Sequence, residues 1–196
     1  MIKGSHNTMS YLPPWKWYLR PFAVWAKCQQ KILKDQMAAG VRYYDLRVRF
    51  DKEGVPYFCH GAMRYRCSDD VRDIVRELAE WSAEISDRIY IRVLLETTST
   101  MSQKERARQE KLFTKLKKGL RAEDRECPSQ IVLSFGVKFP WEWDRTNLPP
   151  FCEISKQFDK KWHAALPPKY WTWEQDRIER ALKDSGFDGI LVKDFI

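Results

Sequence analysis

Two of the chain's three histidines close short strand-like segments, and this placement is typical of an acid–base pair. His6 ends the first such segment and His60 ends the third. Asp45 and Arg47 lie two positions apart in the second, so their side chains leave a strand on the same face. An unperturbed imidazole titrates near ~6.5, so one ring can take a proton from an attacking hydroxyl while the other protonates a leaving alkoxide. The arginine would stabilise negative charge that gathers on a phosphate.

This chemistry needs a scaffold that brings strand ends together, and the chain alternates strand and helix patterns. β-branched and aromatic runs predict seven strands, at the start of the chain up to His6 and at 41–50, 55–60, 88–96, 131–137, 151–158 and 189–196. Helical spacing predicts helices at 22–39, 71–85 with Ser68 as the cap, 102–120 and 173–185. Such alternation indicates a parallel sheet. We therefore expect an α/β fold and one domain over residues 1–196, as a compact (β/α)8 TIM-type barrel that is complete or lacks a strand or helix.

The second strand predicts which side chains face the interior of such a barrel. If Tyr44, Leu46 and Val48 pack outward against helices, Asp45 and Arg47 must point inward. A buried arginine among carboxylates is costly unless it pairs with them or binds an anion. Because the chemistry of these barrels lies at the carboxyl ends of the strands, we expect the active site there.

The composition is that of a soluble globular chain with a basic surface. Lysine and arginine total 35 against 27 aspartates and glutamates, which gives a net charge of +8. This charge favours a membrane surface, a phosphorylated substrate or nucleic acid without choosing among them. The first six residues have no apolar run after their charge, and no stretch approaches the length of a membrane span. We expect a cytoplasmic or peripheral membrane protein without a signal peptide.

The cysteines form no recognisable motif. There are five, Cys28, Cys59, Cys67, Cys127 and Cys152, with no CxxC or CxxH pair among them. An odd number at these spacings indicates neither a zinc site nor a full disulfide framework.

Three motifs in the first third of the chain resemble one known family. They are GSHNTMS at 4–10, GVRYYDLR at 40–47 and FCHG at 58–61. In order and spacing they are similar to the opening segment, the GVRYFDLR strand and the F-x-H-G element of phosphatidylinositol-specific phospholipase C X domains. WAKCQ at 25–29 is similar to the helix before the second motif. The likeness is specific over about residues 3–61 and weaker at 90–96 and 189–196, whereas residues 104–169 do not align.

The resemblance implies a role for each of five residues. His6 would be the general base that activates the inositol 2-hydroxyl, and Asp194 would orient it. His60 would be the general acid toward the diacylglycerol oxygen. Asp45 would support His60 and the phosphate site, and Arg47 would contact the phosphate. The implied reaction is a lyase step that gives a cyclic inositol phosphate and diacylglycerol from a phospholipid at a membrane surface.

Three more residues are expected around the substrate, and they bear on metal dependence. These are Asn7, Glu96 and Lys138. Calcium-dependent relatives keep an acid where this chain has Arg47, whereas metal-independent bacterial relatives keep an arginine. Asn7 and Glu96 resemble the calcium-dependent members, in which they would bind calcium with Asp45. Because a guanidinium stays protonated and cannot ligate calcium, we predict no metal and no other cofactor.

The segment PPWKWYLR at 13–20 follows the first strand and mixes aromatic with basic residues. Such a mixture suits a membrane interface, where tryptophan lies at headgroup depth and cations meet anionic lipid. The alternative is that these rings pack on the adjacent helix. We expect a phospholipid partner, no nucleic acid and no transmembrane segment.

Two other functions remain open. An enzyme with the same barrel would act on another phospholipid or on a glycerophosphodiester, because the histidines and Arg47 fit any phosphate diester. A non-catalytic module would hold anionic lipid or nucleic acid on its basic, aromatic surface. The second alternative does not explain why His6, Asp45, Arg47 and His60 occur together, and imidazoles that face apart would favour it.

Overall fold

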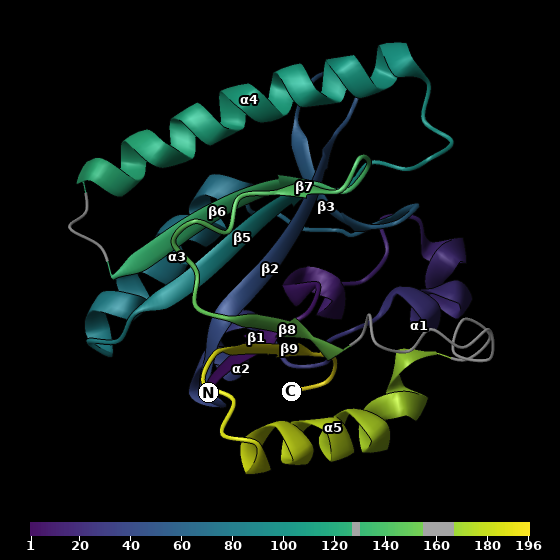
Figure 1. Ribbon diagram of the computed structural model, residues 1–196. Helices are drawn as coiled ribbons and strands as arrows, with labels where there is room; N and C mark the ends of the chain where they lie inside the picture. The colour runs from purple at the N-terminus through teal and green to yellow at the C-terminus, as the bar shows by residue number, and fades with distance from the viewer. Residues whose placement is uncertain (127–129, 155–166) are drawn as a thin grey trace.

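The protein is built around one curled sheet, which the computed structural model describes over residues 1–126, 130–154 and 167–196 (Figure 1). The strands are β1 (Ile2–Ser5), β2 (Val41–Phe50), β3 (Pro56–His60), β4 (Met63–Arg64), β5 (Ile89–Leu95), β6 (Ile131–Val137), β7 (Glu142–Trp143), β8 (Phe151–Glu153) and β9 (Ile190–Lys193). The helices are α1 (Ala23–Ala26), α2 (Leu33–Ala38), α3 (Val71–Glu84), α4 (Gln103–Glu126) and α5 (Thr172–Asp184). Short 3-10 helices are η1 (Thr8–Tyr11), η2 (Trp17–Phe22) and η4 (Pro168–Trp171).

The sheet is mostly parallel and runs in the order β7-β6-β5-β2-β1-β9-β8. β1 pairs in parallel with β2 and β9, and β5 pairs in parallel with β2 and β6. β3 and β7 are antiparallel additions to β2 and β6. Within the described ranges no ladder joins the end strands β7 and β8, so the sheet is an incomplete barrel. The predicted fold class is confirmed.

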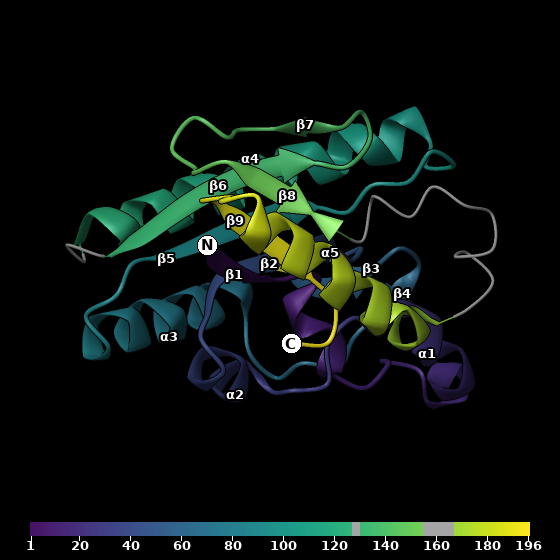
Figure 2. The same cartoon turned by 60° about the horizontal axis from the view of Figure 1, so that its bottom comes forward.

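The helices lie outside the curl. α2, α3 and α4 cover β2, β5 and β6, whereas α5 lies beside β9 on the other side of the molecule (Figures 1 and 2). Outward side chains of β2 enter the main apolar core with residues of α3 and α4, among them Tyr44, Leu46, Val48, Leu78 and Phe113. The outward face predicted for β2 is therefore confirmed.

The inner face of the sheet is layered from apolar to charged. At the amino-terminal ends of the strands a second apolar cluster fills the interior, with Tyr43, Tyr90, Ile190 and Val192 at its centre. The rings of Trp143 and Phe151, from the two end strands, pack with centroids 4.6 Å apart. Further along β2, Asp45 and Arg47 are also buried on the inner face, as the alternation of side chains along this strand predicts.

Gly4 allows β1 to lie deep between its neighbours just before His6. A Cβ at this position would lie 2.8 Å from Cγ2 of Val192 and 3.1 Å from the ring of Tyr43. These distances are shorter than van der Waals contact, so only glycine fits without displacing β9 or β2. The close approach fixes where the next residues of the motif emerge.

The helix predicted over 22–39 is wrong, because the chain is broken in its middle. α1 ends at Ala26 and α2 begins at Leu33. Between them, the backbone N–H groups of Cys28 and Gln29 both donate to Oγ of Ser10 at 2.9 Å. A side chain from an earlier turn thus replaces the intrahelical acceptors and holds the segment against the site.

Several element ends also differ from the prediction. The α3 cap is Asp70 rather than Ser68, and its carboxylate forms a capping box with Asp73. α4 is longer than predicted and extends to Glu126. β8 ends at Glu153, earlier than the strand predicted over 151–158. Residues 155–158 of that prediction lie outside the described residues, and so do Cys127 and His163.

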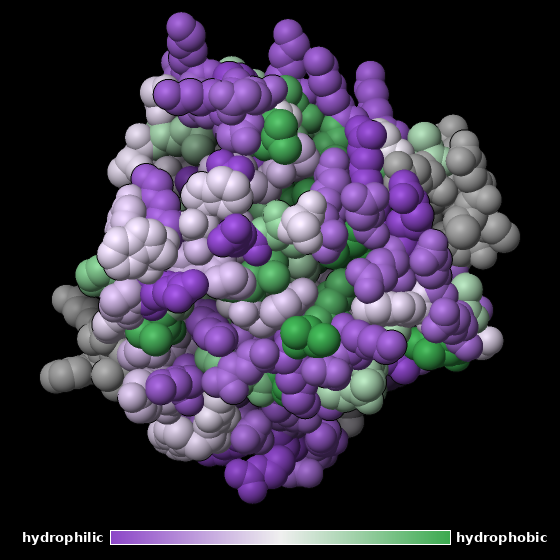
Figure 3. All heavy atoms as spheres, turned by 180° about the vertical axis from the view of Figure 1, so that it is seen from behind, coloured by the Kyte–Doolittle hydropathy of each residue, from purple (hydrophilic) through white to green (hydrophobic). Residues whose placement is uncertain are grey.

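The surface is predominantly hydrophilic on the face opposite to that of Figure 1. Figure 3 shows polar side chains that protrude along the edge formed by α4, with smaller apolar areas across the middle of the face. Among the described residues, the helices lack the combination of length and apolar character that a membrane crossing requires.

Candidate active site

His6 is held by a carboxylate at the end of the neighbouring strand. Its backbone N–H donates to the carbonyl of Lys193 at 3.1 Å, which extends the β1–β9 pairing by one residue. Its Nδ1 lies 2.6 Å from Oδ1 of Asp194. The other oxygen of Asp194 accepts a 3.3 Å bond from Nε2 of Gln175, on α5. The carboxylate is thereby fixed from both sides.

The opposite edge of the His6 ring faces Arg47. Nη2 of the guanidinium lies 2.6 Å from Nε2 of His6. Arginine can only donate and a carboxylate accepts, so the neutral ring carries its proton on Nδ1, toward Asp194, and a lone pair on Nε2. Oε1 of Glu153 lies 3.4 Å from the same Nε2 atom. The lone pair on Nε2 of His6 therefore faces the guanidinium of Arg47.

Asp45 joins two buried arginines beneath this ring. Its Oδ1 accepts from Nε of Arg92 at 2.8 Å and its Oδ2 from Nε of Arg47 at 2.9 Å. The backbone N–H of Asn7 donates to Oδ2 at 3.1 Å. Burial alone would raise the pKa of Asp45, but the two guanidinium charges hold it well below its usual range. Asp45 is therefore a carboxylate that aims Arg47.

The oxygens of Asp45 bind Arg92, Arg47 and the backbone of Asn7, so its predicted support of His60 stays a prediction. Nδ1 of His60 instead donates to the carbonyl oxygen of Ala26 at 3.0 Å. Sγ of Cys28 lies 3.9 Å from the same nitrogen. His60 is thus held by neutral groups of the broken helix rather than by β2.

The two imidazoles nevertheless converge. Their ring centroids are 5.8 Å apart and the planes meet at 86°, edge to face. Burial, and then the positive charge of Arg47, lower the pKa of His60 to about 4. The free site therefore contains a neutral His60 at physiological pH, partly exposed at the rim.

Glu96 gathers three groups at the end of β5. Its Oε1 accepts from Nζ of Lys138 and from the backbone N–H of Gly61, the latter at 3.0 Å. Its Oε2 lies 3.5 Å from Nη1 of Arg47. Burial would raise the pKa of Glu96, but Arg47 and Lys138 lower it. This carboxylate links the predicted Lys138 to the residue after His60.

Asn7 is part of the framework in this structure. Its backbone is left-handed, with φ 44°, where asparagine is among the tolerated residues. Its side-chain Nδ2 lies 3.5 Å from the hydroxyl of Tyr65. The residue turns the chain from β1 into η1 and is buried. A direct contact of Asn7, Glu96 or Lys138 with substrate stays a prediction.

Sequence reasoning missed Arg92, Glu153 and Gln175. Arg92 is completely buried on β5, and its Nη1 lies 3.6 Å from Oε2 of Glu153. Burial would raise the pKa of Glu153, but Arg92, His6 and Arg47 lower it to about 2. The one available signal was an arginine at an inward position in the middle of an otherwise apolar strand.

The residues suggested as calcium ligands do not offer a calcium shell. The carboxylate of Asp45 is shared by two guanidinium groups, and that of Glu96 by Lys138 and Arg47. Calcium requires six to eight oxygen ligands that can surround it. Here protein cations already occupy both carboxylates, so these residues do not fit a calcium ion.

Comparisons with known proteins identify the fold. No protein-family model matches the chain, and no match was found among curated proteins. A structure of phosphatidylinositol-specific phospholipase C from Staphylococcus aureus aligns with 99% of this chain and 85% of its own, at 15% identity and a TM-score of 0.62. The corresponding enzyme from Listeria monocytogenes aligns with 99% of this chain and 87% of its own, at 16% identity and a TM-score of 0.58. The chain therefore has the barrel-type fold of the bacterial phosphatidylinositol-specific phospholipases C.

Proposed function

We propose that this protein is a metal-independent phosphodiesterase of the phospholipase C type, with phosphatidylinositol as its substrate. The observation that carries the proposal is the convergence of His6, His60 and Arg47 at one mouth of the sheet. The imidazole centroids are 5.8 Å apart, and Arg47 lies against the basic edge of His6. A non-catalytic module has no need for this arrangement.

His6 is the general base in this mechanism. Its Nε2 lone pair accepts the proton of the attacking inositol hydroxyl, while Asp194 holds the Nδ1 proton at 2.6 Å. The carboxylate stabilises the imidazolium that forms and preserves the tautomer. As the proton leaves, the hydroxyl oxygen bonds to phosphorus.

Arg47 supplies positive charge to the phosphoryl oxygens. It is aimed from behind by Asp45 at 2.9 Å, with Glu96 3.5 Å from the other side of its guanidinium. A guanidinium matches two phosphate oxygens with a pair of parallel donors. Its shift from Nε2 of His6 to the phosphate also releases the base for the hydroxyl.

His60 completes the reaction as the general acid. The bond from phosphorus to the diacylglycerol oxygen breaks, and that oxygen takes a proton from the imidazolium. The products are a cyclic inositol phosphate and diacylglycerol. Because the pKa of His60 is about 4 in the free site, partly through the charge of Arg47, a bound diester anion is needed to favour the protonated ring.

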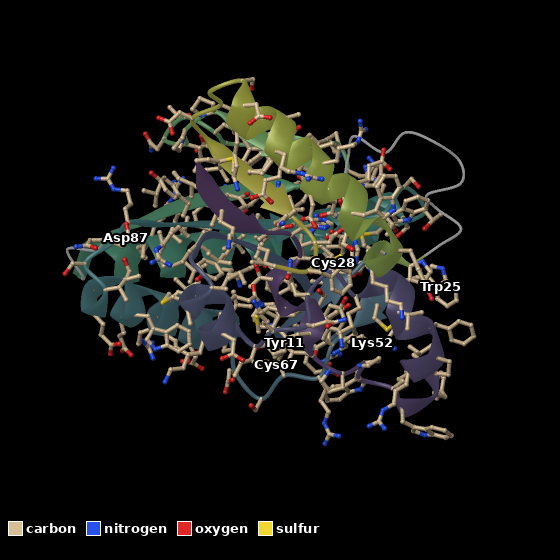
Figure 4. All side chains as sticks on the ribbon, turned by 90° about the horizontal axis from the view of Figure 1, so that it is seen from below. Tyr11, Trp25, Cys28, Lys52, Cys67 and Asp87 are labelled. Atoms are coloured by element: carbon tan, nitrogen blue, oxygen red, sulfur yellow. The ribbon has the colours of Figure 1, made fainter. Side chains whose placement is uncertain are left out.

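The aromatic segment beside the site supports a membrane-bound substrate. Trp17 is 77% exposed and Phe22 is 61% exposed, and Trp173 near η4 is 61% exposed. Nζ of Lys16 lies 5.6 Å from the ring of Tyr18. In Figure 4, Trp25 projects from the edge of the molecule. Exposed rings mixed with cations suit the headgroup region of an anionic bilayer, so we propose that this edge meets the membrane.

The test is an assay of the purified protein on phosphatidylinositol, phosphatidylcholine and a glycerophosphodiester, with phosphorus NMR to identify the products. Only phosphatidylinositol should give a cyclic phosphate. His6→Ala and His60→Ala should each lose at least about 10²-fold in rate. Lys52→Ala, in the exposed turn between β2 and β3, is the control that should retain activity. Cleavage of another diester alone would reject the headgroup assignment, and no cleavage of any would reject the enzyme.

A further inference from the structure

A thiol lies beside the two imidazoles, although no cysteine motif marks it in the sequence. One ring nitrogen each from His6 and His60 and Sγ of Cys28 all lie within 4.8 Å of one another. Cys28 is 1% exposed and comes from the segment that interrupts the predicted helix. Figure 4 shows it in the middle of the molecule. Two imidazoles and a thiol are the donors that zinc prefers.

The separations suit a tetrahedral ion. Nitrogen and sulfur ligands at about 2.0–2.3 Å from zinc lie about 3.3–3.6 Å from one another. Sγ of Cys28 is already 3.9 Å from Nδ1 of His60. Shifts of about 1 Å would bring all three donors to these separations.

The hydrogen bonds around His60 tolerate this change. If Nδ1 of His60 binds an ion, its proton moves to Nε2 and its bond to the carbonyl oxygen of Ala26 is lost. That oxygen still accepts a 2.8 Å bond from the hydroxyl of Tyr65, so it is not left unsatisfied. The cost of rearranging His60 is therefore small.

The surrounding charges also accommodate a cation. The carboxylate of Asp194 is 2.6 Å from Nδ1 of His6 and interacts with the Cys28 thiol as well. The charge of Arg47 opposes a cation here, and its ion pairs with Asp45 and Glu96 reduce that opposition.

We propose that His6, Cys28 and His60 form an inhibitory site for a soft divalent cation, Zn²⁺ in the first instance. The inhibitory effect rests on the proposed function, because the ion would occupy both imidazoles that the reaction requires. The binding itself does not rest on it. A thiolate-containing site excludes hard cations such as Ca²⁺, which prefer oxygen ligands.

Binding is tested first without any substrate. The EDTA-treated protein is titrated with Co²⁺, which reports a thiolate ligand through a charge-transfer band, and then with Zn²⁺ in competition. One ion should bind per chain with the thiolate band present, and Ca²⁺ should not compete. Cys28→Ser should abolish the band and weaken Zn²⁺ at least about tenfold, since even outer-shell losses cost roughly 10–100-fold.

Two further variants serve as a control and as a second test of Zn²⁺ binding. Cys67→Ser is the matched control, because Figure 4 shows Cys67 near Tyr11 and away from Cys28, and it should bind like the wild type. His60→Gln should weaken Zn²⁺ as Cys28→Ser does, which covers the case in which the latter fails to fold. Absence of the thiolate band in the wild type, or equal Zn²⁺ affinity in all variants, would overturn the site.

Activity measurements distinguish a failure of the metal site from a failure of the proposed function. Zn²⁺ should inhibit diester cleavage, and EDTA should reverse the inhibition. If diesters are cleaved but no thiolate complex forms, the metal site is wrong and the enzyme stands. If one ion binds through Cys28 but no diester is cleaved, the metal site stands and the enzyme is wrong. Zn²⁺ binding through Cys28 without inhibition would reject the assigned roles of the two imidazoles.

Discussion

The wall formed by β1, β9 and β8 and the arm formed by β3 and β4 each present one imidazole, but with opposite kinds of partner. On the wall, His6 lies 2.6 Å from the carboxylate of Asp194 and 3.4 Å from that of Glu153. On the arm, His60 has a backbone carbonyl at 3.0 Å and a thiol at 3.9 Å. The site therefore contains one imidazole placed among full charges and one among neutral dipoles.

This difference supports the different roles proposed for the two rings. A ring beside a fixed carboxylate has its tautomer set before substrate arrives and its imidazolium stabilised afterwards, which suits a base. A ring whose pKa is lowered to about 4 holds a proton weakly and gives it up readily, which suits an acid once the substrate has helped to charge it. Variants that alter one environment and leave the other intact test this difference.

The largest effect is expected from Asp194→Asn on the wall. The amide can turn its NH₂ group toward Nδ1 of His6 and move the ring proton to Nε2, the atom that must accept one. We expect kcat/KM to fall about 10²–10⁴-fold in the phosphatidylinositol assay. Asp176→Asn is the control, because its carboxylate pairs with Lys193 outside the interior at 3.0 Å. Similar losses in both variants would show that the wall carboxylate has no special role.

The next effect concerns stability, in which the wall and β2 share a buried charge network. Asp45→Asn removes the negative charge between Arg92 and Arg47, and each guanidinium is left poorly compensated. We expect the free energy of unfolding, measured in urea, to fall by about 3–5 kcal/mol. Asp87→Asn removes an ion pair with Arg42 at the surface and should cost less than about 1 kcal/mol. Equal losses would mean that the inner network contributes no more than a surface pair.

Strand alternation was enough to predict the inward face of β2. Tyr44, Leu46 and Val48 do pack in the outer core, while Asp45 and Arg47 face inward, because a period of two leaves no other choice. The same rule did not reveal the network, which depends on register. Arg92 meets Asp45 because those two positions are directly paired between β5 and β2. Strand order and register are tertiary properties that one strand's pattern does not contain.

The surroundings of His60 were predicted poorly for a related reason. Apolar spacing favours a continuous helix over 22–39, and it gives no sign that Ser10 will capture two backbone N–H groups of that segment. The break is what brings Ala26 and Cys28 to His60. Local propensity loses here to a hydrogen bond between residues 18 positions apart.

The third effect is a pH dependence that belongs to the arm. His60 has a lower pKa in the folded protein, about 4, than the ordinary value of 6.5, so the unfolded chain binds more protons between these values. Folding is therefore penalised below pH 6.5, increasingly toward pH 4, and the penalty vanishes at higher pH. His60→Gln cannot charge and should gain on the order of 1–2 kcal/mol of stability over the wild type on going from pH 7.5 to pH 5. Urea unfolding of the EDTA-treated proteins at both pH values measures this gain. If the free energies of unfolding of His60→Gln and the wild type differed by the same amount at both pH values, the lowered pKa of His60 would be contradicted.

The smallest effect is expected from removing divalent cations. This experiment tests whether the wall and the arm require a divalent cation for catalysis. Arg47 already lies between the two regions, paired with Asp45 and 3.5 Å from Glu96, and Lys138 adds a second positive charge to Glu96. A phosphate that enters this space meets fixed protein cations, so EDTA should leave the rate of phosphatidylinositol cleavage unchanged and Ca²⁺ should not increase it. Arg47→Ala is the informative companion, because it removes that charge without adding a calcium ligand, and Ca²⁺ should not rescue it. If chelation stopped the wild-type enzyme and Ca²⁺ restored it, the acidic side chains would have to release their arginines to bind the ion, and the role assigned to Arg47 would be wrong.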